Sequence, residues 1–253
     1  MQKISVVIVA KDEAEIIGQT ILSLSGLTDD VFIADTGSKD DTINIARSLG
    51  ARVESLTWEG FGRTKNKALE RAVYDWVLFL DADESIDAGL KRSLQELEPE
   101  NPSMVYKIRF KNFIGGQRMS YGEWGNERKI KVFNRKYAKW DDAEIHEKIL
   151  TGQGGGVKTL EGFVVHSLMK DLGEYAAKMN RYGELMAQKY YQQGKKAGWF
   201  KLYLYPAFRF LQLYIFKLGL LDGRMGFAAA YFGAYYAFLK YHRLKELQQS
   251  HPL

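Results

Sequence analysis

The chain has 253 residues, 46% of them hydrophobic and 26% charged, so it is long enough for one large globular domain and is not predicted to be disordered. It contains no cysteine, which excludes a disulfide framework, a thiolate metal site and a cysteine nucleophile. The net charge of +5 is uneven, because residues 170–253 carry 13 Lys and Arg against 5 Asp and Glu, together with more than half of the aromatic residues. No secretory signal is expected from the first residues, which fits a cytoplasmic location.

Apolar runs typical of strands alternate with amphipathic runs typical of helices in the N-terminal half. The expected strands cover residues 4–10, 31–34, 51–56 and 76–80, and the expected helices cover 13–25, 42–49 and 64–72. Short turns between such alternating elements predict an α/β fold with a parallel sheet and helices on both faces. Ligands bind at the carboxyl ends of the strands in sheets of this kind, so we expect the site there.

The pattern changes after about residue 104. Residues 104–110, 129–134 and 162–166 are predicted strands of a mixed or antiparallel extension of the sheet, and 171–193 is a predicted amphipathic helix. Two strongly apolar helices are expected near residues 198–220 and 226–239. The four polar residues of the first fall within an arc of roughly 160°, which favours an interfacial or a core helix over a membrane-spanning one. Contact with an anionic membrane surface and packing as a helical subdomain both stay open.

Acidic residues follow three of the predicted strands. They are Glu13, Asp35 and the pair Asp81 and Asp83. Carboxylates at such positions suit hydroxyls, nucleobase N–H groups and a divalent cation. An Asp-x-Asp directly after a buried strand suits Mg²⁺ or Mn²⁺ bridging a diphosphate. The sequence has no phosphate loop, no GxGxxG after a strand and no GxSxG, which argues against an ATPase, a dinucleotide oxidoreductase and a serine hydrolase.

Several strings resemble inverting family 2 glycosyltransferases, namely SVVIVAKDEAEII, FIADTGSKDDT, KNKAL and WVLFLDADE. Two later strings, WDDAEIHEKI and LDGRMGFAAA, resemble the bacterial branch that contains lipopolysaccharide-core β-glucosyltransferases. The resemblance implies a GT-A nucleotide-sugar-binding fold, Rossmann-like with a mostly parallel sheet, followed by a helical membrane-associating region. We expect a glycosyltransferase domain at 1–169, with a nucleotide-sugar half at 1–90 and an acceptor half at 91–169, and a basic aromatic region at 170–253.

The resemblance also implies roles for single residues. Glu13 would approach the ribose, Asp35 would accept the uracil N–H, and Lys65 would lie near the base or the diphosphate. Here Asp12 stands where the family usually has Asn. The residues expected to bind the donor are Ala10, Glu13, Asp35, Lys65 and Asp81, and those expected to hold the metal are Asp83, Asp81 and His146.

Each of these residues also has a structural interpretation. Asp35 can be a helix cap, Lys65 a solvated lysine, and Glu13 a first-turn acid favoured by the helix dipole. Trp124 and Trp140 can form a platform for a sugar ring or can belong to the core.

The catalytic base is the least determined residue. An inverting transfer needs a carboxylate that deprotonates the acceptor hydroxyl. Glu147 and Asp142 are the expected candidates, since both lie in the segment that resembles the acceptor side, and Glu127 and Asp141 follow them. His146 can ligate the metal, orient the base, contact the diphosphate or pack in the core.

The expected function is metal-dependent transfer of a hexose, with glucose as the expected sugar, from a UDP-sugar to a lipid-linked saccharide such as the lipopolysaccharide inner core. The enzyme would be peripheral on the inner face of the plasma membrane, with Mg²⁺ or Mn²⁺ as cofactor and no nucleic-acid partner. Three alternatives stay open: transfer to a polyprenyl phosphate, a donor-binding scaffold without activity, and a basic nucleic-acid-binding protein. The nucleic-acid-binding alternative predicts salt-sensitive binding to DNA or RNA that does not require UDP.

Overall fold

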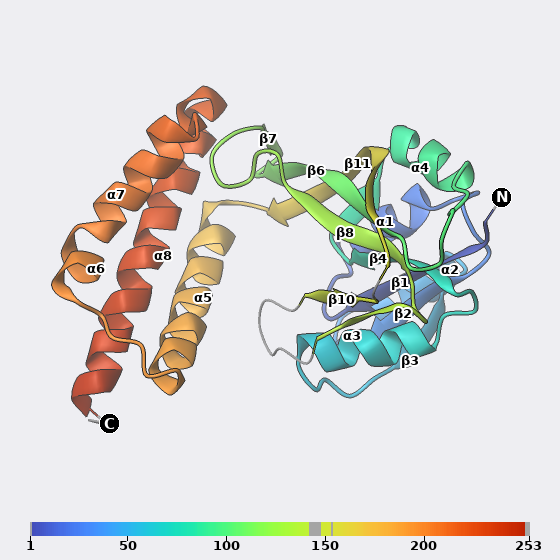
Figure 1. The fold of residues 1–253 in the computed structure, drawn as a ribbon, viewed down its shortest axis with the longest axis horizontal. Helices are drawn as coiled ribbons and strands as arrows, with labels where there is room; N and C mark the ends of the chain where they lie inside the picture. Colours follow the sequence, from blue (N-terminus) through green and yellow to red (C-terminus); the bar gives the residue numbers. More distant parts are fainter. Residues whose placement is uncertain (1, 142–147, 153, 251–253) are drawn as a thin grey trace. The chain divides into compact units, whose positions relative to one another are not determined.

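A computed structural model describes residues 2–141, 148–152 and 154–250 of the chain (Figure 1). The chain forms two compact units. Unit 1 comprises residues 1–110 and 127–166, and unit 2 comprises residues 111–126 and 167–253. Two long strands, β6 (Val105–Ile114) and β11 (Val157–Met169), contribute residues to both units.

Unit 1 is built on a mixed sheet with flanking helices. Its further elements are β1 (Ile4–Ala10), α1 (Ile17–Ser23), β2 (Val31–Asp35), α2 (Thr42–Ser48), β3 (Arg52–Ser55), α3 (Phe61–Glu70), β4 (Trp76–Asp81), β5 (Glu84–Ile86), α4 (Ala88–Gln95), β8 (Arg128–Asn134), β9 (Ala138–Trp140) and β10 (Ile149–Thr151). Among the described residues the strand order is β3-β2-β1-β4-β8-β6-β11-β5. β3, β2, β1 and β4 are parallel, whereas β8 joins β4 antiparallel. The parallel half and its antiparallel extension therefore follow the predicted arrangement.

Alternate side chains of the central strand β1 pack on opposite faces of this sheet. Val6 and Ile8 belong to a core that includes Ile17 of α1, while Val7 belongs to a second core that includes Ala68 of α3. A strand covered on both faces has no position that favours a polar residue, which explains why residues 4–10 are almost continuously apolar. The two helix layers thereby fix the ends of β1, β2 and β4, where the acidic residues begin.

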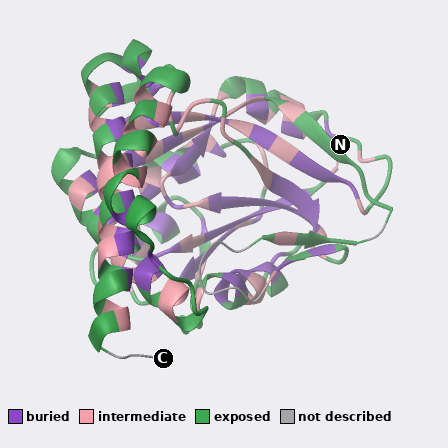
Figure 2. Cartoon of the chain, turned by 60° about the vertical axis from the view of Figure 1, so that its left-hand side comes forward, coloured by how far each residue is buried: buried purple, intermediate pink, exposed green. Residues whose placement is uncertain are grey.

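Unit 2 is mainly helical. Its elements are β7 (Gln117–Met119), α5 (Leu172–Gln192), α6 (Trp199–Tyr203), α7 (Tyr205–Leu211), the π-helical turn η1 (Gln212–Phe216), the 3₁₀ turn η2 (Gly219–Asp222) and α8 (Gly223–Ser250). α8 packs against both α5 and α7. Figure 2 shows long exposed stretches on these helices, while the strands of unit 1 are largely buried. Within the described ranges, no helix is both long and apolar enough to cross a membrane.

The expected helix at residues 198–220 is divided into several short elements. Pro206 stands at the start of α7, where its missing N–H costs nothing, and α6 ends just before it. The helical path ends at Leu218, whose φ of 57° lies in the left-handed region. The last helix extends beyond the predicted residues 226–239 in both directions.

The string LDGRMGFAAA, at residues 221–230, has a structural role in unit 2. The buried carboxylate of Asp222 accepts backbone N–H groups from Ser120 at 3.1 Å and Tyr121 at 2.9 Å, and so ties the β6–β7 hairpin to the start of α8. Gly226 lies so close to η2 that a Cβ atom there would be 1.8 Å from the carbonyl oxygen of Gly219. Only glycine fits this contact without a shift of the backbone.

Candidate functional site

The carboxyl ends of three parallel strands meet at one edge of unit 1. In the strand register Ala10 is paired with Asp35, and Val9 on the other side is paired with Asp81. Three of the predicted donor-binding residues therefore come together at this edge, as expected for strands that run in the same direction.

Asp35 holds the turn that follows β2. Its side chain is buried, with 2% of the residue exposed, and its two carboxylate oxygens accept the backbone N–H groups of Gly37 at 3.0 Å and Ser38 at 3.2 Å. The residue that caps α2 is Asp41, so the interpretation of Asp35 as a helix cap is wrong. A carboxylate has about four acceptor positions, which leaves capacity for a ligand N–H.

Hydrogen bonds join the loop after β1 to the loop after β2 and to the first residue of α2. Asp12 donates its N–H to Ser38 Oγ at 2.9 Å and accepts the N–H of Lys39 at 2.7 Å, and Glu13 donates its N–H to Thr42 Oγ1 at 2.8 Å. The φ of Asp12 is 56°, a conformation that Asn and Asp adopt more readily than most residues. This local requirement accounts for a short polar residue at position 12 and places Glu13 at the same edge.

Lys65 points from α3 towards the end of β4. Only 8% of the residue is exposed, and its Nζ lies 3.6 Å from Asp81 Oδ1. The same amino group lies over the rings of Trp140, at 4.6 Å, and Phe79, at 5.3 Å. The adjacent Asn66 exchanges two hydrogen bonds of 2.9 Å with the backbone of Trp140. Lys65 is therefore a buried cation beside the DxD sequence, and its interpretation as a solvated helix lysine is wrong.

Lys131 of β8 lies between two carboxylates. Its Nζ donates to Glu84 Oε2 at 2.5 Å and to Asp81 Oδ2 at 3.3 Å. Glu84 is fully buried, and Lys131 is 3% exposed. The same Glu84 oxygen accepts the backbone N–H of Asp81 at 3.0 Å. Glu84 and Lys131 thus hold both the backbone and the side chain of Asp81.

The charges of this cluster depend on one another. Burial by itself would raise the pKa of Asp81, but the amino groups of Lys131 and Lys65 outweigh it and hold that pKa well below its usual range. Burial raises the pKa of Glu84 in spite of the adjacent Lys131, and the charge of Asp81 adds to the rise. Burial would lower the pKa of Lys131, but Asp81 and Glu84 raise it above its usual value.

Asp83 faces a histidine that comes from β11. Its Oδ2 lies 3.3 Å from Nε2 of His166, and the imidazole ring packs edge-on against Phe110. The pairing of β5 with β11 sets this contact, because His166 is the register partner of Glu84. Within the described ranges, no three His, Asp or Glu side chains converge into a site that could hold a metal ion by themselves.

Three predicted site residues lie outside the described residues. They are the two expected candidates for the base, Asp142 and Glu147, and one predicted metal ligand, His146. The two other candidates for the base are described. Asp141 exchanges hydrogen bonds with the backbone of Lys148, at 2.9 and 3.0 Å, and Glu127 pairs with Lys129 at 3.0 Å.

Both tryptophans that were candidates for a sugar platform belong to hydrophobic clusters. Trp140 is buried in unit 1 and packs edge-on against Phe79 and Phe133. Trp124 lies in unit 2, where its indole N–H donates to the hydroxyl of Tyr175 at 3.1 Å. Their positions agree with the core interpretation.

Three residues of the cluster were not singled out from the sequence, namely Glu84, Lys131 and His166. A weak signal exists for two of them. Lys131 interrupts the apolar residues of a strand, and His166 stands at the end of the predicted strand 162–166. Neither signal specifies a partner, because the contacts join segments that are 47 or more positions apart.

Comparison with known proteins identifies the family. Residues 5–161 match the family described as "Glycosyl transferase family 2". The chain belongs to this family, so it is a glycosyltransferase with the α/β fold of the GT-A type. An uncharacterized glycosyltransferase of Rickettsia typhi is 28% identical over 98% of this chain and 88% of its own length. The lipopolysaccharide core biosynthesis glycosyltransferase LpsC of Rhizobium meliloti is 29% identical over 93% of this chain and 89% of its own length.

Solved structures with partial similarity include glucosyl-3-phosphoglycerate synthase of Mycobacterium tuberculosis. One structure of that enzyme, in complex with Mn²⁺, UDP-glucose and phosphoglyceric acid, is 28% identical and covers 45% of this chain and 44% of its own, with a TM-score of 0.34. Another, in complex with Mn²⁺, UDP and glucosyl-3-phosphoglycerate, is 21% identical and covers 65% of this chain and 72% of its own, with a TM-score of 0.39.

Proposed function

We propose that this glycosyltransferase is an inverting, metal-dependent enzyme that transfers a hexose from a UDP-sugar to a lipid-linked saccharide of the lipopolysaccharide core. The observation that carries the proposal is the convergence of Asp35, Lys65 and Asp81 at the carboxyl edge of the parallel strands. Glucose is the proposed sugar, and residues 1–90 are the proposed donor-binding half.

The donor would lie along this edge. Asp35 would accept the N–H of uracil, because its carboxylate is held in place by the turn and retains acceptor capacity. Glu13 would accept a ribose hydroxyl from the adjacent loop, next to Ala10. Lys65 would contact the diphosphate, for which a buried cation beside the DxD sequence supplies the opposite charge.

The donor set around Asp83 fits a divalent cation. The carboxylate of Asp83 and the imidazole of His166 already lie 3.3 Å apart, and Asp81 is two residues away. Mg²⁺ is usually held by one or two carboxylates with substrate phosphates and water as further ligands, so a complete protein cage is not required. We propose Asp83 as the principal protein ligand, with Asp81 or a histidine as a second ligand, either His166 or the His146 expected from the sequence, and with the donor diphosphate and water completing the coordination. The cation would offset the negative charge of the leaving diphosphate.

Lys131 and Glu84 position Asp81 in this proposal. Lys131 keeps Asp81 ionised, since it holds the pKa of that carboxyl low. An ionised Asp81 has the charge that a cation or a ribose hydroxyl requires. Glu147 or Asp142 would take the proton of the acceptor hydroxyl, as the general base of an inverting transfer.

The proposed acceptor rests on the similarity to LpsC, which spans nearly the whole chain. A lipid-linked acceptor places the enzyme at the inner face of the plasma membrane as a peripheral protein. Incubation with a polyprenyl phosphate and with a lipopolysaccharide core that lacks its outer sugars separates this acceptor from the main alternative. Transfer to the polyprenyl phosphate alone would contradict the proposal.

Thermal unfolding with nucleotides tests the donor assignment. With Mg²⁺ or Mn²⁺ present, UDP is expected to raise the melting temperature and GDP to raise it much less. The stabilisation grows as RT ln(1 + [L]/Kd), about 2.7 kcal/mol when the ligand is at 100 Kd. Asp35→Asn should weaken the response to UDP, because its amide N–H₂ would face the uracil N–H. An equal response to GDP would contradict the assignment.

A further inference from the structure

Large apolar side chains are exposed along the helices of unit 2. They gather between residues 199 and 238, on α6, α7, η1, η2 and α8, and comprise Trp199, Phe200, Tyr203, Leu204, Phe208, Leu211, Ile215, Phe216, Leu218, Leu220, Leu221, Phe227, Tyr231 and Phe238. At α7 they recur at intervals of three or four residues, as in Leu204, Phe208 and Leu211, which is the spacing of one helix face. So much exposed apolar surface in a single region is characteristic of a binding surface.

A cluster of lysines lies in the same unit. The amino groups of Lys195 and Lys240 lie over the ring of Tyr190, at 4.1 and 5.4 Å, and those of Lys201 and Lys240 lie over the ring of Tyr241, at 5.6 and 4.8 Å. In the part of the chain that the structure describes, none of the three forms an ion pair with a carboxylate. The carboxylate that acts on Lys240, that of Glu123, is itself paired with Arg209.

The positive charges of this cluster act on one another. Burial, followed by the charges of Arg209, Lys195 and Lys201, lowers the pKa of Lys240 to about 8. Arg209 differs from the three lysines because it pairs with Glu123 at 2.7 Å. An anionic group beside the lysines would relieve this repulsion.

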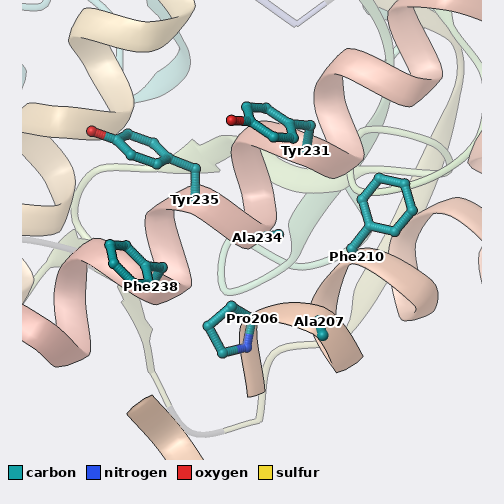
Figure 3. A pocket seen from close by; sticks show the side chains of 7 residues that line it. All are labelled: Pro206, Ala207, Phe210, Tyr231, Ala234, Tyr235 and Phe238. Atoms are coloured by element: carbon teal, nitrogen blue, oxygen red, sulfur yellow. The ribbon is translucent and has the colours of Figure 1, made fainter. Parts of the chain in front are cut away.

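A shallow, open apolar groove with a volume of 390 Å³ lies on the surface where α7 packs against α8. Figure 3 shows the lining side chains, with Pro206, Ala207 and Phe210 on α7 and Tyr231, Ala234, Tyr235 and Phe238 on α8. Tyr205, which precedes Pro206, packs edge-on against Tyr241 at 5.7 Å, so the lysine cluster adjoins one end of the groove.

We propose that unit 2 docks on a membrane through an anionic phospholipid, whose acyl chain occupies the groove between α7 and α8 and whose phosphate lies against the exposed Lys195 and Lys201, with the buried Lys240 behind them. This inference deepens the proposed function and rests on it only for the location of the acceptor. The exposed aromatic and aliphatic side chains would enter the interface around the bound lipid.

Charge complementarity favours an anionic phospholipid as the partner. An apolar face without charge would suit a protein or a neutral lipid equally well. Lysines that form no ion pair among the described residues, beside an apolar groove, match a ligand with an anionic head and a hydrocarbon chain. Each basic residue near an anionic leaflet contributes a factor of about five to binding. A nucleic acid would satisfy the lysines but would leave the exposed apolar residues in water, so binding to RNA is an outcome that would refute the proposal.

Co-flotation of the full chain with lipid vesicles tests the docking. Vesicles of phosphatidylglycerol and phosphatidylcholine should carry the protein, and vesicles of phosphatidylcholine alone should carry little. Phe208→Glu with Leu211→Glu should abolish flotation, since each of these side chains contributes about tenfold or more when it is buried in the bilayer. Leu22→Glu with Val73→Glu changes two apolar residues of unit 1 that are more exposed than Phe208 and Leu211, and it should have no effect.

Two further pairs of variants test the charge and the groove. Lys195→Gln with Lys201→Gln should weaken binding about 25-fold, whereas Lys136→Gln with Lys158→Gln, which removes the same charge from exposed residues of unit 1, should not.

Ala234→Gln places a polar side chain in the groove and should weaken binding, whereas Ala177→Gln on the exposed face of α5 should not. If a variant and its matched control lose vesicle binding to the same extent, the contact that the variant tests is refuted.

The response to UDP separates this proposal from the proposed function. Flotation together with no stabilisation by UDP would uphold the docking and contradict the donor assignment. A normal response to UDP in a protein that stays soluble with phosphatidylglycerol vesicles at low salt would refute the docking alone. Equal flotation with both kinds of vesicle, or a preference for RNA over vesicles, would refute the role of the lysines.

Discussion

Replacing Lys131 with methionine removes the ammonium that bridges Glu84 and Asp81. Glu84 is fully buried and Lys131 is 3% exposed, so the substitution leaves a carboxylate without its partner in a site that excludes water. Breaking such a buried pair costs about 3–5 kcal/mol. The side chain of Asp81 is 41% exposed, so water screens its charge and the loss of its contact with Lys131 adds little to the cost. We therefore expect Lys131→Met to lower the free energy of unfolding by about 3–5 kcal/mol at pH 8.

The loss should be smaller at pH 5. Burial already raises the pKa of Glu84 in the intact protein, and removal of Lys131 would raise it further. A carboxyl whose folded pKa lies above its unfolded value loses stability as pH rises from that unfolded value, about 4.3 for Glu. At pH 5 Glu84 can take up a proton, and the buried charge disappears. Lys131 itself is charged throughout this range, because its pKa is raised.

Urea unfolding at pH 5 and pH 8 measures both effects. Lys129→Met is a matched control on the same strand, since Lys129 and its partner Glu127 are both partly exposed and the loss of this pair should cost less than about 1 kcal/mol. Lys131→Arg should restore part of the stability. The reasoning is refuted if Lys131→Met loses no more than Lys129→Met, or if its loss is equal at the two pH values.

Three further predictions concern the metal, the base and unit 2. Asp83→Ala should abolish transfer while circular dichroism shows an intact fold, and EDTA should do the same reversibly; full activity in either case contradicts the metal site. Glu147→Gln or Asp142→Asn should lower kcat by about 10²–10⁴-fold with donor affinity kept, and near-normal rates in both would place the base elsewhere. Gly226→Ala should destabilise the protein by about 1–3 kcal/mol in thermal unfolding, because its Cβ would lie 1.8 Å from the first carbonyl oxygen of η2. Gly198 has open space around it, so Gly198→Ala should not destabilise the protein. Equal stability of the two variants would contradict the close contact at Gly226.

The strands of the parallel sheet could be predicted from the sequence because burial on both faces leaves an almost continuous apolar run. β1 covers the predicted residues 4–10, and β4 extends the predicted run by one residue to Asp81. The start of α1 could not be predicted in the same way. The N–H groups of Glu13 and Ala14 are bound by the side chains of Thr42, the first residue of α2, and of Asp40 in the loop before it, so the chain turns through residues 14–16 before the helix begins at Ile17. Such long-range bonds leave no local periodicity.

The site was predictable only where the sheet itself brings residues together. Parallel strands bring their carboxyl ends to one edge, so Asp35 and Asp81 could be placed there from their positions after apolar runs. Lys131 and His166 reach the same cluster from antiparallel strands whose register no local spacing reveals. Their partners became visible only with the fold.

Release of UDP from a panel of UDP-sugars is a direct measure of metal-dependent donor use. The full chain should consume a UDP-hexose, with UDP-glucose the best donor, when Mg²⁺ or Mn²⁺ is present and not after treatment with EDTA. Asp83→Ala should release no UDP under the same conditions. Failure to consume any UDP-sugar with either metal, or unchanged release by Asp83→Ala, would contradict the proposed function.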